Sequence, residues 1–248
     1  MKASAVSYLN TKPFLHGLEI SPVKGLNISL DIPSECARKL LENEVDLGLI
    51  PVAVIPLLEE SHILPGYCIG ADGPVESVKL YSEVPLQEIK TIVLDYQSRT
   101  SVTLVRVLAR EYWKISPEWK KGTEGFEQKI SGTTAAVVIG DRTFTMNGKF
   151  RYEYDLAGEW KNMTNLPFVF ACWVSNKPLP ENFKKEFSAA MEAGLQDIKT
   201  VIEKESPKYL PFDVEKYLTR SLNLRLDKQG ETAIELFLAK MKQLVPLV

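Results

Sequence analysis

The 248-residue sequence is poor in residues that bind metals or cross-link chains, with three cysteines and two histidines. Cys36, Cys68 and Cys172 lie far apart and form no Cys-x-x-Cys pair, so they predict neither a disulfide framework nor a zinc knuckle. An odd number of separate cysteines is typical of a reducing compartment. His16 and His62 have no acid or nucleophile at a fixed spacing, so no catalytic triad is indicated. We therefore expect neither a metal nor a cofactor.

The sequence also lacks an excess of either charge. Its 30 Lys and Arg residues nearly balance 32 Asp and Glu residues, which gives a formal net charge of −2. A nucleic acid or an anionic membrane surface requires a basic footprint, so neither partner is expected. An anionic ligand would have to be bound by a few local groups.

Long hydrophobic runs are missing as well. A membrane-spanning helix needs roughly 20 apolar residues, whereas the longest run, 47–58, is interrupted by Pro51 and Pro56. Residues 1–10 lack the apolar stretch and the small-residue cleavage site of a secretory signal. We expect a cytoplasmic protein that is a monomer or a weak homodimer.

The segments that are present alternate between short apolar runs and amphipathic stretches, which is typical of α/β proteins. Turn residues fill 65–73, and a new strand–helix pattern starts near Pro85. The apolar spacing of the tail indicates helices only. The expected strands are 3–8, 28–30, 45–50, 76–82, 91–95, 135–139 and 168–174, and the expected helices are 34–42, 52–60, 98–113, 181–205, 214–219 and 228–244.

This order of elements predicts a two-lobed α/β fold. We expect the first lobe to comprise residues 1–84 and 175–248, with the C-terminal helices packed on it, and the second lobe to comprise 85–174. Ligands of such folds bind beyond the carboxyl ends of the strands and in clefts between lobes. The loops that follow strands should therefore carry the function.

The most specific of these loops is the junction between the strand at 91–95 and the helix at 98–113. Ser98, Thr100 and Ser101 place three hydroxyls at the start of this helix, and Arg99 adds a guanidinium. Free N–H groups and the helix dipole favour an anion at such a position, and an arginine can bind a carboxylate with two hydrogen bonds. The alternative is a helix that is merely capped by Ser98.

Three further loops hold polar residues at strand ends. Asn10 follows the first strand and offers both donors and an acceptor, Ser77 follows a Gly- and Pro-rich turn, and Gly140-Asp141 ends the strand at 135–139. Each loop also fits an ordinary role, because polar turns and an aspartate cap at a helix start are common.

Several of these strings, taken together, resemble one family, the chorismate dehydratases of the futalosine route to menaquinone. The resemblance extends from residue 3 to about residue 173. The strings that carry it are Val6-Ser7-Tyr8-Leu9-Asn10-Thr11-Lys12-Pro13, Asp46-Leu47-Gly48-Leu49-Ile50-Pro51-Val52, Gly73-Pro74-Val75-Glu76-Ser77-Val78, Ser98-Arg99-Thr100-Ser101 and Gly140-Asp141.

The resemblance implies a fold similar to type II periplasmic solute-binding proteins, with a ligand cleft between the lobes. It also implies that the protein eliminates water from chorismate, a small dicarboxylate, to give 3-[(1-carboxyvinyl)oxy]benzoate. The residues carried over as catalytic are Asn10 and Ser77. Those carried over as substrate-binding are Tyr8, Ser98, Arg99, Thr100, Ser101, Gly140 and Asp141. Arg142 and Thr143 depart from the small residues that often follow in relatives.

The base that removes the proton stays open, because no histidine presents itself. The enolpyruvyl carboxylate of the substrate and a bound water are both candidates. Other classes of function also fit the fold: a non-catalytic binding protein for a small carboxylate, the effector lobes of a transcription regulator, and the related 1,4-dihydroxy-6-naphthoate synthase. The absence of a signal segment disfavours the first, and the absence of a helix-turn-helix segment disfavours the second.

Overall fold

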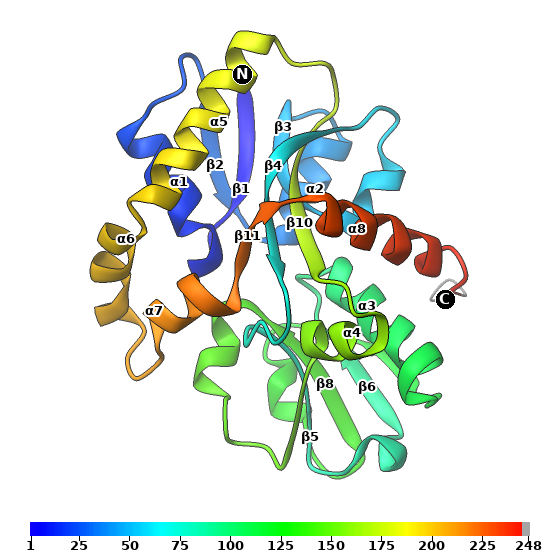
Figure 1. The fold of residues 1–248 in the computed structure, drawn as a ribbon. Helices are drawn as coiled ribbons and strands as arrows, with labels where there is room; N and C mark the ends of the chain where they lie inside the picture. The colour runs from blue at the N-terminus through cyan, green and yellow to red at the C-terminus, as the bar shows by residue number, and fades with distance from the viewer. Residues whose placement is uncertain (245–248) are drawn as a thin grey trace. The chain divides into compact units, whose positions relative to one another are not determined.

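The computed structural model describes residues 1–244 and divides the chain into two compact units (Figure 1). The first unit comprises Met1–Gly70 and Phe170–Asp227, and the second comprises Ala71–Val169 and the residues from Lys228 onward. Each unit has its own sheet and its own helices. The two α/β units predicted from the alternation of strands and helices are thus confirmed.

The first unit is built on a six-stranded sheet in the order β11-β4-β10-β3-β1-β2. β1 runs parallel to β2 and β3, and β10 runs antiparallel to β3. Every residue of β3 and β10 is buried, which accounts for their continuous apolar sequences. The strands are β1 (Lys2–Val6), β2 (Asn27–Asp31), β3 (Leu47–Pro51), β4 (His62–Ala71), β10 (Phe168–Ser175) and β11 (Asn223–Leu226).

The helices of the first unit are α1 (Lys12–Ile20), α2 (Pro33–Leu41), α5 (Glu181–Gln196), α6 (Ile198–Glu205) and α7 (Val214–Lys216). α1 and α2 each have a proline in the first turn, where its missing N–H costs no hydrogen bond. The core holds Trp173 of β10 between two rings, with centroids 6.3 Å from Phe14 and 5.0 Å from Phe187. α1 and α5 therefore pack on the sheet through aromatic side chains.

The second unit is built on a five-stranded sheet in the order β7-β6-β8-β5-β9. β6 runs parallel to β7 and β8, whereas β5 runs antiparallel to β8 and β9. The start of β5 therefore lies at the same edge as the carboxyl ends of β6 and β8. The strands are β5 (Val78–Ser82), β6 (Thr91–Leu94), β7 (Glu118–Lys121), β8 (Thr134–Ile139) and β9 (Tyr152–Asp155).

The described part of the second unit also contains the helices α3 (Thr100–Leu108), α4 (Leu156–Thr164) and α8 (Lys228–Met241). α3 continues as a π-helical turn over Ala109–Trp113, so the helix predicted for 98–113 is largely confirmed. α8 packs against α3. Its Phe237 ring meets Trp160 and Phe168 edge-on, with centroids 6.1 and 5.1 Å away.

The boundaries of the units differ from those expected from the sequence in two places. Residues 71–84 were expected in the first lobe, but β5 lies between β8 and β9 in the second sheet. The expectation that all C-terminal helices pack on the first lobe is met by α5 and α6, which contact α1, and not by α8. The apolar faces of β5 and α8 have their partners far away in the sequence, so local pattern does not reveal the unit to which they belong.

Two predicted elements have a different form. The turn-rich segment 65–73 is mostly strand β4, because burial of Tyr67, Cys68 and Ile69 outweighs the preference of its glycines and proline for turns. The single helix predicted for 181–205 is two helices, α5 and α6, which are separated at Asp197.

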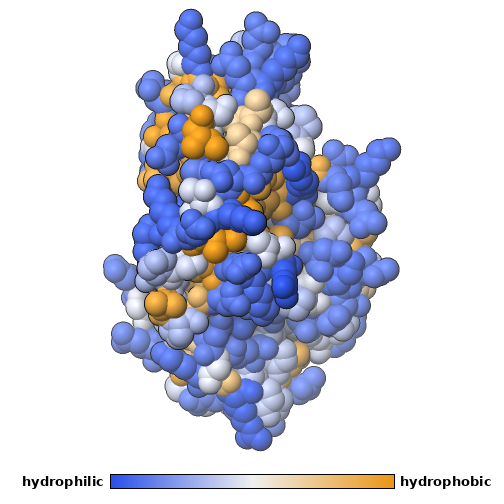
Figure 2. All heavy atoms as spheres, turned by 60° about the vertical axis from the view of Figure 1, so that its left-hand side comes forward, coloured by the Kyte–Doolittle hydropathy of each residue, from blue (hydrophilic) through white to orange (hydrophobic). Residues whose placement is uncertain are grey.

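Hydrophilic residues predominate on the face drawn in Figure 2, and hydrophobic residues are visible there only in small groups. The apolar side chains lie mostly in the cores of the two units. Within residues 1–244, no helix combines the length and the apolar character needed to cross a bilayer.

Candidate functional site

One edge of the second sheet gathers most of the predicted site residues. Ser77 precedes β5, the segment 95–101 follows β6, and Gly140 follows β8. Val78 pairs with Ile139 in the sheet, and the Gly140 N–H donates a hydrogen bond to the Ser77 carbonyl oxygen at 2.8 Å. Ser77 is only 2% exposed. The structure therefore brings these three loops together, as expected for a ligand-binding edge of an α/β sheet.

Asp95 ties two of these loops to each other. Its Oδ1 accepts a hydrogen bond from the Gln97 N–H at 2.9 Å, and its Oδ2 accepts one from the Ile139 N–H at 3.0 Å. The guanidinium of Arg142 forms an ion pair with Oδ2. Burial raises the pKa of Asp95, and the charge of Arg142 opposes that rise. The carboxylate thus holds the ends of β6 and β8 in register.

Arg142 is a structural partner in this cluster. It also forms an ion pair with Glu127, and its guanidinium carbon lies 5.7 Å from the ring centroid of Tyr96 and 5.6 Å from that of Phe126. Cation–π contacts of this length are attractive. Arg142 therefore places a cation against the buried Asp95.

The start of α3 holds three buried hydroxyl residues. Ser98 is 7% exposed, and Thr100 and Ser101 are each 2% exposed. The Ser98 Oγ accepts a hydrogen bond from the Ser101 N–H at 3.0 Å. Ser98 thus caps the helix, and the cap occupies the Ser101 N–H, which is one of the free N–H groups that were expected to bind an anion. The helix dipole and the remaining polar groups of residues 98–101 still favour negative charge here.

A pocket of about 510 Å³ lies elsewhere in the first unit, near His62, whereas a pocket of about 340 Å³ includes part of the predicted site. Ser98 and Arg99 belong to the second pocket, together with Lys121 at the end of β7. Arg99 and Lys121 are exposed, and within residues 1–244 neither side chain forms an ion pair. The full lining is Leu94, Asp95, Tyr96, Ser98, Arg99, Val102, Lys121 and Gly122.

Lys121 was not predicted from the sequence. It lies beside the site because β7 runs parallel to β6 with Leu94 opposite Lys121. Its neighbour Gly122 donates its N–H to the Leu94 carbonyl oxygen at 2.8 Å. The only signal in the sequence was a short polar strand, 118–121, after the helix at 98–113. The two cations give this pocket a positive potential suited to a carboxylate.

The first unit carries the two remaining predicted residues, Tyr8 and Asn10. They follow β1 and are half-buried, and Asn10 lies in a 3₁₀ turn over Leu9–Thr11. The Asn10 Oδ1 accepts a hydrogen bond from the Thr11 Oγ1 at 3.1 Å. This hydrogen bond uses only the side-chain oxygen of Asn10, so the amide nitrogen can still donate a hydrogen bond to a ligand. Both residues lie at the carboxyl end of a parallel strand, where the sequence placed them.

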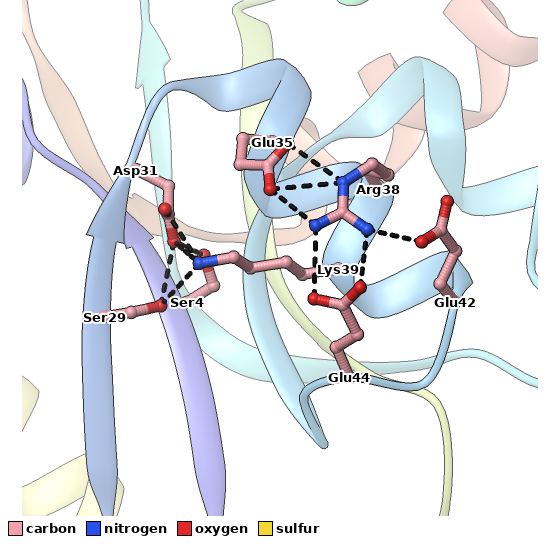
Figure 3. A network of polar contacts seen from close by, with 8 residues as sticks. All are labelled: Ser4, Ser29, Asp31, Glu35, Arg38, Lys39, Glu42 and Glu44. Atoms are coloured by element: carbon pink, nitrogen blue, oxygen red, sulfur yellow. Dashed lines mark hydrogen bonds and ion pairs between the residues drawn. The ribbon is translucent and has the colours of Figure 1, made fainter.

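The sequence missed a polar network near this edge of the first sheet (Figure 3). Lys39 of α2 donates to both carboxylate oxygens of Asp31, at 2.8 and 2.7 Å, and Ser4 and Ser29 donate to Oδ2 at 2.7 and 2.8 Å. Burial raises the pKa of Asp31, but these hydrogen bonds outweigh it and hold the pKa below the usual value. The network joins β1, β2 and α2.

Figure 3 also shows Arg38 between three glutamates, Glu35, Glu42 and Glu44. These side chains are between about a third and a half exposed, so each pair contributes little to stability. In the part of the chain that the structure describes, no group of three or more His, Cys, Asp or Glu side chains is placed to hold a metal ion.

Each unit is thus an α/β sheet domain with polar loops at a carboxyl edge, and solved structures share the same architecture. The chain has a TM-score of 0.78 with the X-ray structure of a protein from Archaeoglobus fulgidus, at 14% identity, covering 98% of this chain and 96% of that one. It has a TM-score of 0.63 with a Candida albicans protein that exhibits the generic periplasmic-binding-protein fold, at 15% identity, covering 100% and 92%. With the alkanesulfonate-binding protein SsuA from Xanthomonas axonopodis pv. citri the TM-score is 0.61, at 14% identity, covering 97% and 92%.

These similarities define the class: the protein has a two-lobed, periplasmic-binding-protein-like α/β fold, as the resemblance in the sequence predicted. The chain belongs to the menaquinone biosynthesis family, whose profile matches residues 1–243. It is 27% identical over 219 residues to a chorismate dehydratase from Thermus thermophilus, a match that covers 80% of this chain and 79% of the relative.

Proposed function

We propose that this protein is a chorismate dehydratase, which converts chorismate and releases water to give 3-[(1-carboxyvinyl)oxy]benzoate. The observation that carries the proposal is the 27% identity to a chorismate dehydratase over 80% of the chain, inside a family of menaquinone biosynthesis. The polar edges of the two sheets support it, because they supply hydroxyl, amide and cationic groups suited to a small dicarboxylate.

One carboxylate of the substrate binds at the start of α3 in this proposal. The hydroxyl residues Ser98, Thr100 and Ser101 offer hydrogen bonds, and Arg99 and Lys121 supply positive charge beside a pocket of about 340 Å³. Gly140 and Asp141 belong to the same edge, where a glycine permits close approach of a ligand to the backbone. A protein with a net charge of −2 thereby attracts an anion through local groups.

The reaction needs no oxidant and no cofactor. A base removes the proton at C3, and the electron pair extends into the ring carboxylate to form a dienolate. The dienolate then expels the C4 hydroxyl, which takes up a proton and leaves as water, while the ring becomes aromatic. Hydrogen-bond donors around the carboxylate stabilise the charge that develops on it.

Asn10 and Ser77 act on the part of the substrate that reacts. The amide nitrogen of Asn10 donates to an oxygen of the C4 hydroxyl or the enolpyruvyl group, and Ser77 orients the same region. The base is the enolpyruvyl carboxylate of the substrate itself or a bound water. Tyr8, two residues before Asn10 in the same loop, contacts the substrate.

The test is incubation of the purified protein with chorismate, followed by ultraviolet absorbance and mass spectrometry. The expected product is lighter than chorismate by one water and has the spectrum of a substituted benzoate. Recovery of unchanged chorismate would contradict the proposal, and a rise in melting temperature without turnover would indicate a binding protein instead.

Variants then test the assigned residues. We expect Asn10→Ala and Ser77→Ala to lose most turnover while they keep their far-ultraviolet spectra. Ser188→Ala and Asn162→Ala are matched controls, because both residues are exposed and lie on helices, α5 and α4, that carry none of the predicted site residues. Full activity of both test variants would contradict the roles assigned to Asn10 and Ser77, but it would not contradict the proposed reaction.

A further inference from the structure

Asp155, at the junction of β9 and α4, accepts more hydrogen bonds than a helix cap requires. Its Oδ1 accepts the N–H groups of Ala157 and Gly158, each at 3.1 Å, which cap the first turn of α4. The same oxygen accepts the Val75 N–H at 3.0 Å, and Oδ2 accepts the Glu76 N–H at 2.7 Å. Two of its four backbone partners therefore lie about eighty residues earlier in the chain.

These two partners belong to the loop that ends at Ser77. Glu76 has a φ of +67°, which a residue with a side chain rarely adopts, and Gly73 has a φ of +130°. A strained backbone of this kind persists only where surrounding contacts hold it. The hydrogen bond from Glu76 to Asp155 acts on the strained residue itself.

Packing holds the same loop from a second side. A Cβ atom on Gly158 would lie 3.3 Å from the Pro74 Cγ, so the glycine lets α4 approach the loop closely. On the other side of Glu76, the carbonyl of Ser77 accepts the Gly140 N–H at 2.8 Å. Two features thus restrict the Ser77 backbone. Its carbonyl is bonded by Gly140 at the end of β8, and the residue before it, Glu76, has a left-handed conformation.

We propose that Asp155 is a positioning residue for Ser77: by holding the Glu76 backbone in its left-handed conformation, it sets the direction in which the Ser77 side chain points. The inference rests on the proposed function, since it takes Ser77 as a residue that contacts the substrate. Asp155 itself does not touch the reacting atoms. Lys79 lies opposite Asp155 in the sheet, where its positive charge partly offsets the negative charge of Asp155. Lys79 also forms an ion pair with Glu153.

The two roles of Asp155 are separable by substitution. In Asp155→Ser, a short hydroxyl side chain still caps α4, because serine is among the best N-cap residues, but it has no second oxygen in the place of Oδ2 to accept the Glu76 N–H. The matched control is Asp213→Ser, which makes the same change at the start of α7, where Asp213 accepts the Lys216 N–H at 2.9 Å. Asp213 lies in the first unit, whereas Ser77 lies in the second.

We expect Asp155→Ser to stay folded, with a melting temperature below that of Asp213→Ser because the hydrogen bond to Glu76 is lost, and to lose about tenfold or more in kcat for chorismate, with KM changed by less than about threefold. A second substitution, Glu76→Gly, should restore much of the lost kcat in the Asp155→Ser background, because glycine adopts a positive φ without strain. An unchanged kcat in Asp155→Ser, or a loss that Glu76→Gly fails to reduce, would overturn the inference.

Hydrogen exchange gives a readout that does not need turnover. The amides of residues 75–77 should exchange faster in Asp155→Ser than in the unmodified protein, while those in the middle of α4 stay protected. Equal exchange at residues 75–77 would overturn the inference whatever the activity. Absence of turnover in the unmodified protein would instead count against the proposed function, so the two failures are distinguishable.

Discussion

Gly17 of α1 and Gly194 of α5 lie backbone to backbone. A Cβ atom on Gly194 would lie 2.7 Å from the Gly17 nitrogen and 2.0 Å from the Pro13 carbonyl oxygen. A Cβ atom on Gly17 would lie 2.0 Å from the Ala190 carbonyl oxygen. All these neighbours are backbone atoms, so they cannot move aside as a flexible side chain would.

Gly194→Ala is therefore expected to destabilise the first unit, although alanine favours helix. The added methyl group forces α1 and α5 apart, and overpacking of this kind costs about 1–3 kcal/mol. The melting temperature should fall by roughly 3–10 °C, as measured by differential scanning calorimetry. Lys185→Ala, on the exposed face of the same helix, is the control and should shift it by less than about 1 °C. A melting temperature for Gly194→Ala equal to that of the control would contradict this packing.

Lys121→Gln is expected to weaken substrate binding. The residue lines the pocket at the start of α3, and loss of one charge-assisted contact there should cost about 1 kcal/mol, or roughly fivefold in the KM for chorismate. The kcat should change little, because the carboxylate contact is present before and during the reaction. Steady-state kinetics on Lys120→Gln is the control, since that side chain points to the opposite side of the strand and pairs with Glu118. Equal KM values in the two variants would show that Lys121 does not contact the substrate.

The three cysteines are predicted to be inert in the folded protein. Cys36, Cys68 and Cys172 are free and buried, and burial raises the pKa of Cys36 and of Cys68 to about 12. The thiolate is the form that reacts, so little of it is present near pH 8. Iodoacetamide at pH 8 should add no carbamidomethyl group to the native protein and three in urea, as counted by mass spectrometry. Fast labelling of the native protein would show that the cores open readily.

A pH effect is expected from the pair of Glu192 on α5 and Arg225 on β11, whose Oε2 and Nη1 atoms are 2.9 Å apart. The hydrogen bond from Arg225 lowers the pKa of Glu192 to about 2. A depressed carboxyl pKa adds stability above the pKa of the unfolded chain, about 4.5, and this stability is lost as the pH falls towards 2.

The measurement is the melting temperature of Arg225→Gln against the unmodified protein at several pH values and constant ionic strength. The difference should be constant from pH 7 to 5 and should shrink between pH 4.5 and 2. Arg220→Gln, which removes an exposed arginine near β11, provides the control for net charge. A difference that stays the same at pH 2.5 would mean that the pair does not stabilise the fold through its charge.

Sequence pattern predicted the elements whose own residues determine them. β8 and β10 are continuous apolar runs, and α3 has an apolar face at helical spacing, so their positions follow from the chain itself. β4 was missed because its glycines and proline favour turns, and only burial in the sheet of the first unit makes it a strand. The polar strand β9 gave no apolar alternation to recognise.

The residues of the candidate site also fall into two groups, those that the sequence predicted and those that it did not. Ser98 and its capping role were predictable because the acceptor and the donor are three residues apart. Asp155 and Lys121 were not, since Asp155 meets Val75 and Glu76 across about eighty residues and Lys121 reaches the site through the pairing of β7 with β6. Contacts between distant segments depend on sheet order, which a single sequence does not reveal.

The division of the chain into units has a consequence for its synthesis. The second unit starts at Ala71, is left at Val169 and is completed only by the segment from Lys228, after the whole of the first unit has been made. During synthesis, Phe237 is made after Trp160 and Phe168, the two aromatic residues that it contacts. The second unit, which holds Ser77 and the start of α3, therefore cannot complete its aromatic core until residues 170–227 have also been synthesised. Neither unit corresponds to one uninterrupted stretch of the gene, and an excised fragment 71–169 would lack the helix that covers its aromatic core.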